Sequence, residues 1–278
     1  MARNDNASLP RAGLAEDLGL PSLAASRLPT VTRAEMVEVD RAAIEDYGIS
    51  LVRMMENAGA GLADLTRRSL GGSCAGRRVG VVAGRGNNGG GGLVAARRLL
   101  LWGAEVEVLL AADASEFAGV AAEQLAILQR LGLSPKALDG QALNRNDALL
   151  GRKDVLIDAV IGYGLRGAAT GAALAAITAI NRAGAPVISL DVPSGLDADG
   201  GEAPGEAVRA TATLTLALPK GGFFLAGAGA YVGRLFLGDV SIPAAAYAFA
   251  GKETPQPFRD GPLVEVIYEG ATLDREPA

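Results

Sequence analysis

The chain has 278 residues, a net charge of −5, 49% hydrophobic residues and 4% aromatic residues. This length and hydrophobic content can bury the core of one large α/β domain, and they exclude a globally disordered chain. Charges of both signs are mixed along the sequence without a basic patch, which excludes an electrostatically driven nucleic-acid binder. No apolar run reaches the roughly 18 residues of a membrane span and no signal peptide is visible, so no membrane association is expected.

The sequence contains no histidine, and this absence restricts the chemistry more than any other feature of the composition. Ser-His-Asp and Cys-His catalytic sites are excluded, as are histidine-ligated zinc and iron centres. Acid–base steps must therefore use Asp, Glu, Lys, Tyr or solvent, and a bound metal should be a hard cation with oxygen ligands. The one cysteine, Cys74, cannot form an intramolecular disulfide, which favours a reducing, cytoplasmic location.

Hydrophobic periodicity and turn signals predict alternating helices and strands. Residues 1–30 mix polar residues with proline and glycine, and we expect a flexible leader there. Thr32 and Glu35 have the spacing of a capping box, which predicts the first helix start. In chain order we expect helices over 32–47 and 51–70, a strand over 77–84, a glycine loop with a helix ending at Trp102, a strand over 104–111, a helix over 115–132, a strand over 153–162, a helix over 170–183, a strand with its loop over 185–195, and strands over 212–218 and 233–240. This alternation predicts a mostly parallel sheet covered on both faces, in one domain over 31–245, followed by a weakly patterned tail over 246–278.

The stretch "AGRGNNGGGGLVAARRL" (83–99) has glycine at six of the nine positions from Gly84 to Gly92. Its segment "GRGNNG" matches the GxGxxG dinucleotide fingerprint and lies between a predicted strand and a predicted helix. Such glycines let the backbone approach a pyrophosphate, and a helix N-terminus offers free N–H groups to an anion. They would equally suit a tight strand-to-helix turn. An ordinary nicotinamide-dependent dehydrogenase is therefore one alternative, with Asp113 as the candidate for contact with the ribose.

Polar side chains also follow the third and fourth of these strands. "LIDAVIGYGLRG" places Asp158 at the end of the third strand, and "LDVPSGLDADG" places Asp191 and Ser194 at the end of the fourth. Ligands of open α/β sheets bind outside the carboxyl ends of the strands, so Asn88, Asp158, Asp191 and Ser194 should converge on one crevice. Their oxygens suit a cation or sugar hydroxyls. Each aspartate alone could also be a helix N-cap.

Taken together, the motifs of residues 32–243 resemble those of the NAD(P)H-hydrate epimerase family, known by its YjeF-type N-terminal domain. The resemblance rests on "EM...D" (Glu35, Met36, Asp40), "MENAG" (55–59), "GNNGG" (86–90) with "GLVAARRL", "IDAVIGYGL" (157–165), "LDVPSGLDAD" (190–199), and "LPKGG" with "GDVSIP". It implies a three-layer αβα, Rossmann-like fold. The implied activity is an isomerase reaction that interconverts the R and S epimers of 6-hydroxylated, hydrated NADH and NADPH, as part of cofactor repair.

The resemblance also implies a potassium ion, a homodimer, and a functional link to an ADP- or ATP-dependent dehydratase. That dehydratase is expected to be a separate protein, because the chain is too short to carry the second domain of some family members. Carried over by motif, the potassium ligands would be Asn88, Asp158 and Ser194. The substrate contacts would be Asn87, Asn88, Gly89, Gly90, Gly91, Gly162, Tyr163, Gly164, Leu165, Arg166, Gly167, Ala168 and Asp191.

This chemistry does not need histidine. C6 of the substrate carries a hydroxyl beside the ring nitrogen, so loss of that hydroxyl as water gives an iminium-like species to which water can return on the opposite face. A carboxyl group can transfer the proton, and Asp191 is our hypothesis for this acid–base residue.

Three positions depart from the family pattern. Gly91 stands where the family has aspartate after "GNNGG", and Thr211 stands where the family tends to have aspartate. Tyr163 replaces a smaller hydroxyl residue. These departures leave open a second reading, in which the chain is a catalytically degenerate member that binds a nucleotide or a protein without turnover. Lys220 could approach the ligand phosphates or be a solvated loop cation.

Overall fold

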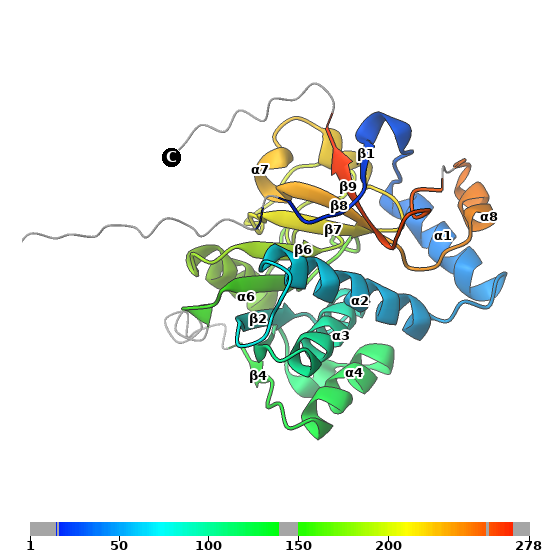
Figure 1. The fold of residues 1–278 in the computed structure, drawn as a ribbon. Coiled ribbons are helices and arrows are strands. Elements are labelled where there is room, and N and C mark those ends of the chain that lie inside the picture. The colour runs from blue at the N-terminus through cyan, green and yellow to red at the C-terminus, as the bar shows by residue number, and fades with distance from the viewer. Residues whose placement is uncertain (1–14, 16, 139–149, 254–255, 269–278) are drawn as a thin grey trace, which may run out of the picture.

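A computed structural model describes residues 15, 17–138, 150–253 and 256–268 (Figure 1). Within these residues lies a nine-stranded sheet of order β1-β9-β8-β7-β6-β5-β2-β3-β4. Its strands are β1 (Ser22–Ala24), β2 (Arg78–Ala83), β3 (Glu105–Leu110), β4 (Lys136–Ala137), β5 (Val155–Ala159), β6 (Val187–Leu190), β7 (Ala212–Leu216), β8 (Arg234–Gly238) and β9 (Leu263–Ile267). All neighbours are parallel except β8 and β9, which confirms the expected mostly parallel sheet.

Helices cover both faces of this sheet. They are α1 (Arg33–Glu45), α2 (Leu51–Ser69), α3 (Asn87–Leu101), α4 (Gly119–Arg130), α6 (Gly171–Arg182), α7 (Gly229–Val232) and α8 (Ala244–Tyr247), with 3-10 turns η1 (Ala25–Arg27), η2 (Ala114–Glu116), η3 (Gly221–Phe224) and η4 (Ala248–Ala250). Val81 of β2 belongs to the buried cluster of Leu62 in α2 and Leu93 in α3, whereas its neighbour Val82 belongs to the cluster of Ile177 in α6. Successive strand residues point to opposite faces, so the expected three-layer αβα fold is confirmed. No helix in the described part of the chain is long and apolar enough to cross a membrane.

The first helix begins as its sequence predicts. Thr32 Oγ1 accepts from the main-chain N–H of Glu35 at 3.2 Å, and Glu35 Oε2 accepts from the N–H of Thr32 at 2.8 Å. This reciprocal capping box satisfies two donors that the helix start leaves without intrahelical partners.

The glycine-rich stretch is only partly a loop, which corrects the expectation from sequence. Helix α3 begins at Asn87, so Gly89 to Gly92 lie in its first turns and are buried. A Cβ at Gly90 would lie 2.6 Å from Met55 Sδ of α2, and one at Gly59 of α2 would lie 2.4 Å from Val94 Cβ of α3. The glycines therefore allow two buried helices to approach closely, and this packing outweighs the poor helix propensity of glycine.

Two strands extend the sheet beyond the range expected from sequence. β1 comes from the expected leader and pairs in parallel with β9, which comes from the expected tail and pairs antiparallel with β8. Strands of three and five residues are too short to give a clear period, whereas the pairing in the folded chain defines them. The helix expected over 115–132 is also shorter, because η2 precedes α4. Residues 1–14 and 16 of the expected leader, and 254–255 and 269–278 of the expected tail, lie outside the described residues.

Candidate active site

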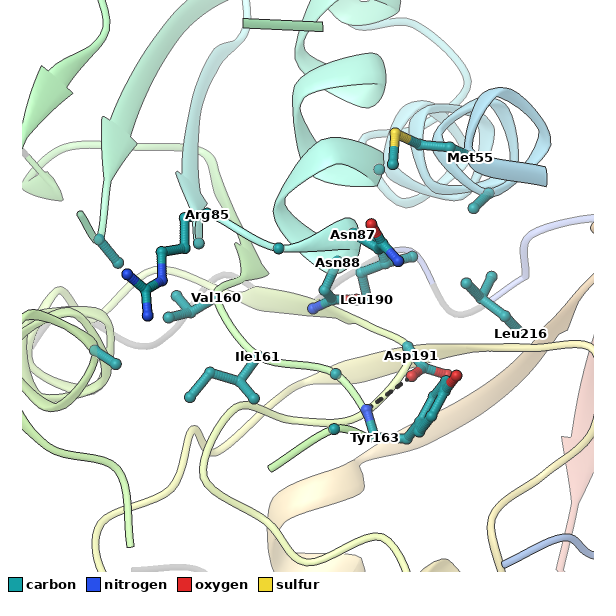
Figure 2. A pocket seen from close by; sticks show the side chains of 18 of the residues that line it. Met55, Arg85, Asn87, Asn88, Val160, Ile161, Tyr163, Leu190, Asp191 and Leu216 are labelled. Carbon is teal, nitrogen blue, oxygen red and sulfur yellow. Dashed lines mark hydrogen bonds between the residues drawn. The ribbon is translucent and has the colours of Figure 1, made fainter. Parts of the chain in front are cut away.

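A cavity of about 860 Å³ opens at the carboxyl edge of the sheet. Its walls come from the loops after β2, β5 and β6, the first turn of α3, and helices α1 and α2 (Figure 2). This volume lies within the range of pockets that hold drug-sized ligands. The position is also the one at which open α/β sheets bind ligands, because the carboxyl ends of parallel strands and the N-termini of the following helices meet there.

Asp191 follows β6 directly and is almost fully buried. Its φ of 66° lies in the left-handed region, which is uncommon for residues other than glycine and is enriched at functional sites. Asp191 Oδ2 accepts from the main-chain N–H of Tyr163 at 3.0 Å, as Figure 2 shows. Asp191 Oδ1 accepts from the ammonium of Lys220 at 2.5 Å.

Lys220 is 1% exposed, so it is not a solvated loop cation, and it lines the cavity. Its Nζ donates to Asp191 Oδ1, to Thr215 Oγ1 at 3.1 Å and to the carbonyl oxygen of Leu216 at 3.0 Å. An ammonium has three donors, so these contacts use its whole hydrogen-bonding capacity. Lys220 therefore forms a buried ion pair in the cavity wall, and its approach to ligand phosphates stays a prediction.

Asp158 lies behind the cavity wall at the end of β5 and is fully buried. Its Oδ1 accepts from Ser194 Oγ at 2.6 Å and from the N–H of Val160 at 3.2 Å. Its Oδ2 accepts from Ser189 Oγ at 2.7 Å and from the N–H of Ser194 at 2.9 Å. Burial raises the pKa of Asp158, although hydrogen bonds from Ser194, Ser189 and Val160 oppose the increase. Asp158 thus ties the loop after β6 to β5.

Asn88 and Asp191 approach each other across Gly162. A Cβ on Gly162 would lie 2.8 Å from Asp191 Oδ2 and 3.1 Å from Asn88 Oδ1, so only glycine leaves room for both side chains. Figure 2 shows Asn88 at the start of α3, facing the loop that carries Tyr163. Asn88 Nδ2 is buried and has no hydrogen-bond partner among the described residues. Such an atom indicates a polar site that a ligand would complete.

Asp40 of α1 is a site residue to which the sequence assigned no role. It lines the cavity, and its Oδ2 accepts from the hydroxyl of Tyr163 at 2.6 Å. Burial raises the pKa of Asp40, with a further increase from Asp191, whereas Tyr163 and Lys220 oppose it. The family motif that contains Asp40 was the only sequence signal for this position. Met36 and Arg85 also line the cavity without having been predicted there.

The structure places part of the expected substrate-binding set in the cavity wall, namely Asn87, Asn88, Gly91, Gly162, Tyr163, Gly164 and Asp191. Other members are not part of that wall: Gly89, Gly90, Leu165, Arg166, Gly167 and Ala168. Gly89 instead packs against the backbone of Gly84. Asp113, considered for a ribose contact, is also absent from the wall, where Ala111, Ala112 and Glu116 lie.

The two departures that replace a family aspartate, Gly91 and Thr211, fall in different places. Gly91 is in the cavity wall, where a Cβ would lie 2.7 Å from Leu190 Cδ2. Thr211 lies at the amino end of β7, opposite the cavity, and its Oγ1 accepts from the N–H of Val187. The changes at Gly91 and at Tyr163, which also lines the cavity, can therefore affect a bound ligand directly, whereas the change at Thr211 cannot.

Comparisons with known proteins agree on one family. The family model described as YjeF-related protein N-terminus matches residues 52–222. An NAD(P)H-hydrate epimerase of Dehalogenimonas lykanthroporepellens is 43% identical over 237 residues, which cover 85% of this chain and 92% of that protein. An NAD(P)H-hydrate epimerase of Truepera radiovictrix is 39% identical over 215 residues, covering 76% and 91% of the two chains.

The chain also matches part of a longer relative and the fold of a solved structure. The bifunctional NAD(P)H-hydrate repair enzyme Nnr of Moorella thermoacetica is 42% identical over 214 residues, which cover 77% of this chain but 40% of that protein. The crystal structure of the yeast protein ynu0 matches with a TM-score of 0.72 and 23% identity, covering 86% of this chain and 100% of that one, and it establishes the likeness of fold. With the family model over 52–222 and full-length relatives at about 40% identity, the chain belongs to the YjeF N-terminal family.

Proposed function

We propose that this protein is an NAD(P)H-hydrate epimerase, which interconverts the R and S epimers of hydrated NADH and NADPH. The observation that carries the proposal is the buried Asp191–Lys220 pair in the wall of a cavity at the carboxyl edge of the sheet. The names of the full-length relatives of Dehalogenimonas and Truepera support the same substrate. A dehydrogenase is not favoured, because Asp113 does not line the cavity.

Asp191 is placed to transfer the proton that the epimerisation needs. We propose that Asp191 passes a proton from the Lys220 ammonium to the C6 hydroxyl. Water then leaves while the ring nitrogen donates its electron pair, which gives a planar iminium and leaves Lys220 neutral. Water then adds to the opposite face of C6 and loses a proton through Asp191 to Lys220, so the starting ion pair is restored. Lys220 balances the carboxylate charge, and the N–H of Tyr163 fixes the orientation of Oδ2.

The rest of the cavity wall offers groups that could bind the phosphates and the apolar parts of a dinucleotide. The N-cap of α3 is Gly86, which has no side chain to cap the helix, and we propose that the first N–H groups of α3 bind an anionic phosphate. Met36, Met54 and Met55 supply an apolar surface on the side of α1 and α2. We propose that Asn87, Asn88, Gly162, Tyr163 and Gly164 contact the substrate from the other side.

The residues near Asn88 fit a potassium ion, in keeping with the family. The oxygens here suit a hard cation: Asn88 Oδ1 lies beside Gly162, and Ser194 Oγ lies 2.6 Å from Asp158 Oδ1, which supplies one negative charge. The unpaired atom of Asn88 is Nδ2, a donor that would face an acceptor rather than the ion. Asp158 and Ser194 Oγ already bond to each other and to the main chain of Val160, Ile161 and Ser194. We therefore propose that Asn88 Oδ1 and Ser194 Oγ hold the ion once the Ser194 contacts rearrange, while Asp158 acts mainly through its charge. When bound, the cation supplies electrostatic stabilisation to the loops around Asp191.

We further propose that a dehydratase consumes the S epimer formed here, since a relative from Moorella is named as a bifunctional repair enzyme. A cytoplasmic location remains our expectation from the single cysteine.

The test is epimerisation of purified R-form hydrated NADH, with potassium or sodium, measured against the spontaneous rate without protein. We expect potassium-dependent turnover by the native chain, and its loss in Asp191→Asn with binding retained. Asp260→Asn changes an exposed carboxylate outside the cavity and serves as the matched control. Native turnover no faster than the spontaneous rate would instead support the degenerate binder, and unchanged turnover in Asp191→Asn would remove the role of Asp191.

A further inference from the structure

We propose that Asp40 is a positioning residue for the reaction: by holding the hydroxyl of Tyr163, it fixes the Tyr163 N–H against the carboxylate of Asp191. This inference rests on the proposed function for its catalytic consequence. The contacts themselves are independent of the substrate. Tyr163 is the link, because its side chain and its main chain bind two different carboxylates.

Tyr163 connects Asp40 to the Asp191–Lys220 pair through three contacts. Its hydroxyl donates to Asp40 Oδ2 at 2.6 Å, a distance typical of a strong hydrogen bond to a carboxylate. Its main-chain N–H donates to Asp191 Oδ2 at 3.0 Å. Its ring centroid lies 5.9 Å from the Nζ of Lys220, the partner of the other Asp191 oxygen. Tyr163 thus contacts both members of the proposed catalytic pair while Asp40 holds its far end.

Helix α1 holds the same loop at a second point. The Arg33 guanidinium donates to the carbonyl oxygen of Leu165 at 2.7 Å, and the N–H of Arg33 donates to Asp199 Oδ1 at 2.7 Å. Arg33 and Asp40 are two helical turns apart, and they bind Leu165 and Tyr163, which are two residues apart in the loop after β5. The loop is therefore fixed from outside the sheet, by a helix more than a hundred residues away in sequence.

The surroundings keep the Tyr163 hydroxyl a donor. Burial raises the pKa of Tyr163, and the neighbouring carboxylates Asp40 and Asp191 raise it further. A neutral tyrosine can donate to Asp40 throughout the working pH range of a protein. Asp191 itself has a φ of 66°, a conformation that persists only where its surroundings hold it. The Asp40–Tyr163 contact is one of the contacts available to do so.

The experiment is a double-mutant cycle with Tyr163→Phe, Asp40→Ala and the double variant in the full chain. Tyr47→Phe and Glu45→Ala are the matched controls, because both remove exposed groups from the C-terminal part of α1 or just beyond it. The first measurement is residue-resolved amide hydrogen exchange of Tyr163, referred to the core amides of Val81 and Leu156. We expect about tenfold faster exchange at Tyr163 in each single variant and no further increase in the double variant. A merely structural role would instead change the core amides.

The second measurement is kcat and KM for epimerisation. We expect each single variant to lower kcat about tenfold with KM nearly unchanged, and the double variant to match the singles. Unchanged protection of the Tyr163 amide in both single variants would overturn the proposal, whether or not the native chain is an epimerase. Additive losses of kcat would also overturn it, because Asp40 would then act on the substrate rather than through Tyr163. If the native chain has no turnover, the proposed function fails, and the exchange measurement still decides the role of Asp40.

Discussion

The ammonium of Lys220 and the carboxylate of Asp191 form a buried ion pair with a separation of 2.5 Å in the cavity wall. The two residues are 29 positions apart, and each comes from a loop at the carboxyl edge of the sheet. Desolvation of two charges is costly, and it is offset here by the other partners of each group: Thr215, Leu216 and the N–H of Tyr163. The pair is therefore stable as a unit and costly to break.

The first prediction concerns the removal of one member of this pair. Lys220→Met leaves Asp191 buried without its countercharge, and we expect the free energy of unfolding to fall by about 3–5 kcal/mol. Lys136→Met removes a half-exposed partner of Glu107, so it should cost less than about 1 kcal/mol. Urea unfolding of both variants measures the difference. Equal losses in the two variants would show that the Lys220 pair is not a stabilising unit.

The second prediction concerns the space between Asn88 and Asp191. Gly162→Ala places a Cβ 2.8 Å from Asp191 Oδ2 and 3.1 Å from Asn88 Oδ1, so both side chains must move. We expect at least a tenfold loss of epimerase activity, because small displacements of catalytic groups are costly. Gly200→Ala adds a Cβ at an ordinary contact distance, 3.5 Å from Asp197 Oδ1, at a position outside the cavity wall, and it should lose far less. Similar kinetics for the two variants would contradict the crowding at Gly162.

The position of the cavity could be predicted from sequence, because the carboxyl ends of neighbouring parallel strands lie together at one edge of the sheet. Asp158 and Asp191 follow neighbouring strands, β5 and β6, so the topology itself brings them together. The burial of Lys220 could not be predicted, since lysine is rarely buried and its partner lies 29 residues earlier. The contact between Asp40 and Tyr163 could not be predicted either, because the two residues are 123 positions apart and hydrophobic periodicity describes only local structure.

The start of helix α3 could not be predicted from the sequence, for a different reason. Six glycines indicated a loop, because glycine disfavours helices. In the folded chain Gly90 lies against Met55 and Gly92 against Ala159, and a side chain at either position would collide with its neighbour. Close packing against α2 and β5 thus decides the local structure. These partners are known only once the layers are assembled.

The third prediction concerns the stability of α1 and its dependence on pH. The hydrogen bond from Lys252 lowers the pKa of Glu35, and the N–H of Thr32 lowers it further. A carboxyl whose pKa is lower in the folded state stabilises the fold above its ordinary value of 4.5, and this contribution is lost as the pH falls below that value. Glu35→Gln should therefore flatten the loss of stability in acid.

Thr32→Ala removes the other half of the same capping box and should cost about 1 kcal/mol at neutral pH. Chemical unfolding across the acid range checks both variants. A steeper loss of stability in acid for Glu35→Gln than for the native chain would contradict the predicted contribution of Glu35.

The last prediction concerns Gly91, where the family has aspartate. Gly91→Asp puts a Cβ 2.7 Å from Leu190 Cδ2 and a new carboxylate into a buried wall, so Leu190 must rotate and the carboxylate needs a partner. We expect the free energy of unfolding to fall by about 1–3 kcal/mol. Leu190→Val in the same chain shortens the obstructing side chain and should restore part of the loss.

The kinetics of these two variants then distinguish the two readings of this chain. A native chain that turns over and a Gly91→Asp variant no faster than it would mean that Asp191 and Lys220 suffice, and that Leu190 fills the space near Gly91. Turnover that appears only in Gly91→Asp/Leu190→Val would mean that the wall lacks one carboxylate for catalysis. The native protein would then bind its ligand without converting it, because the cavity, the Asn88 amide and the Asp191–Lys220 pair are all still in place.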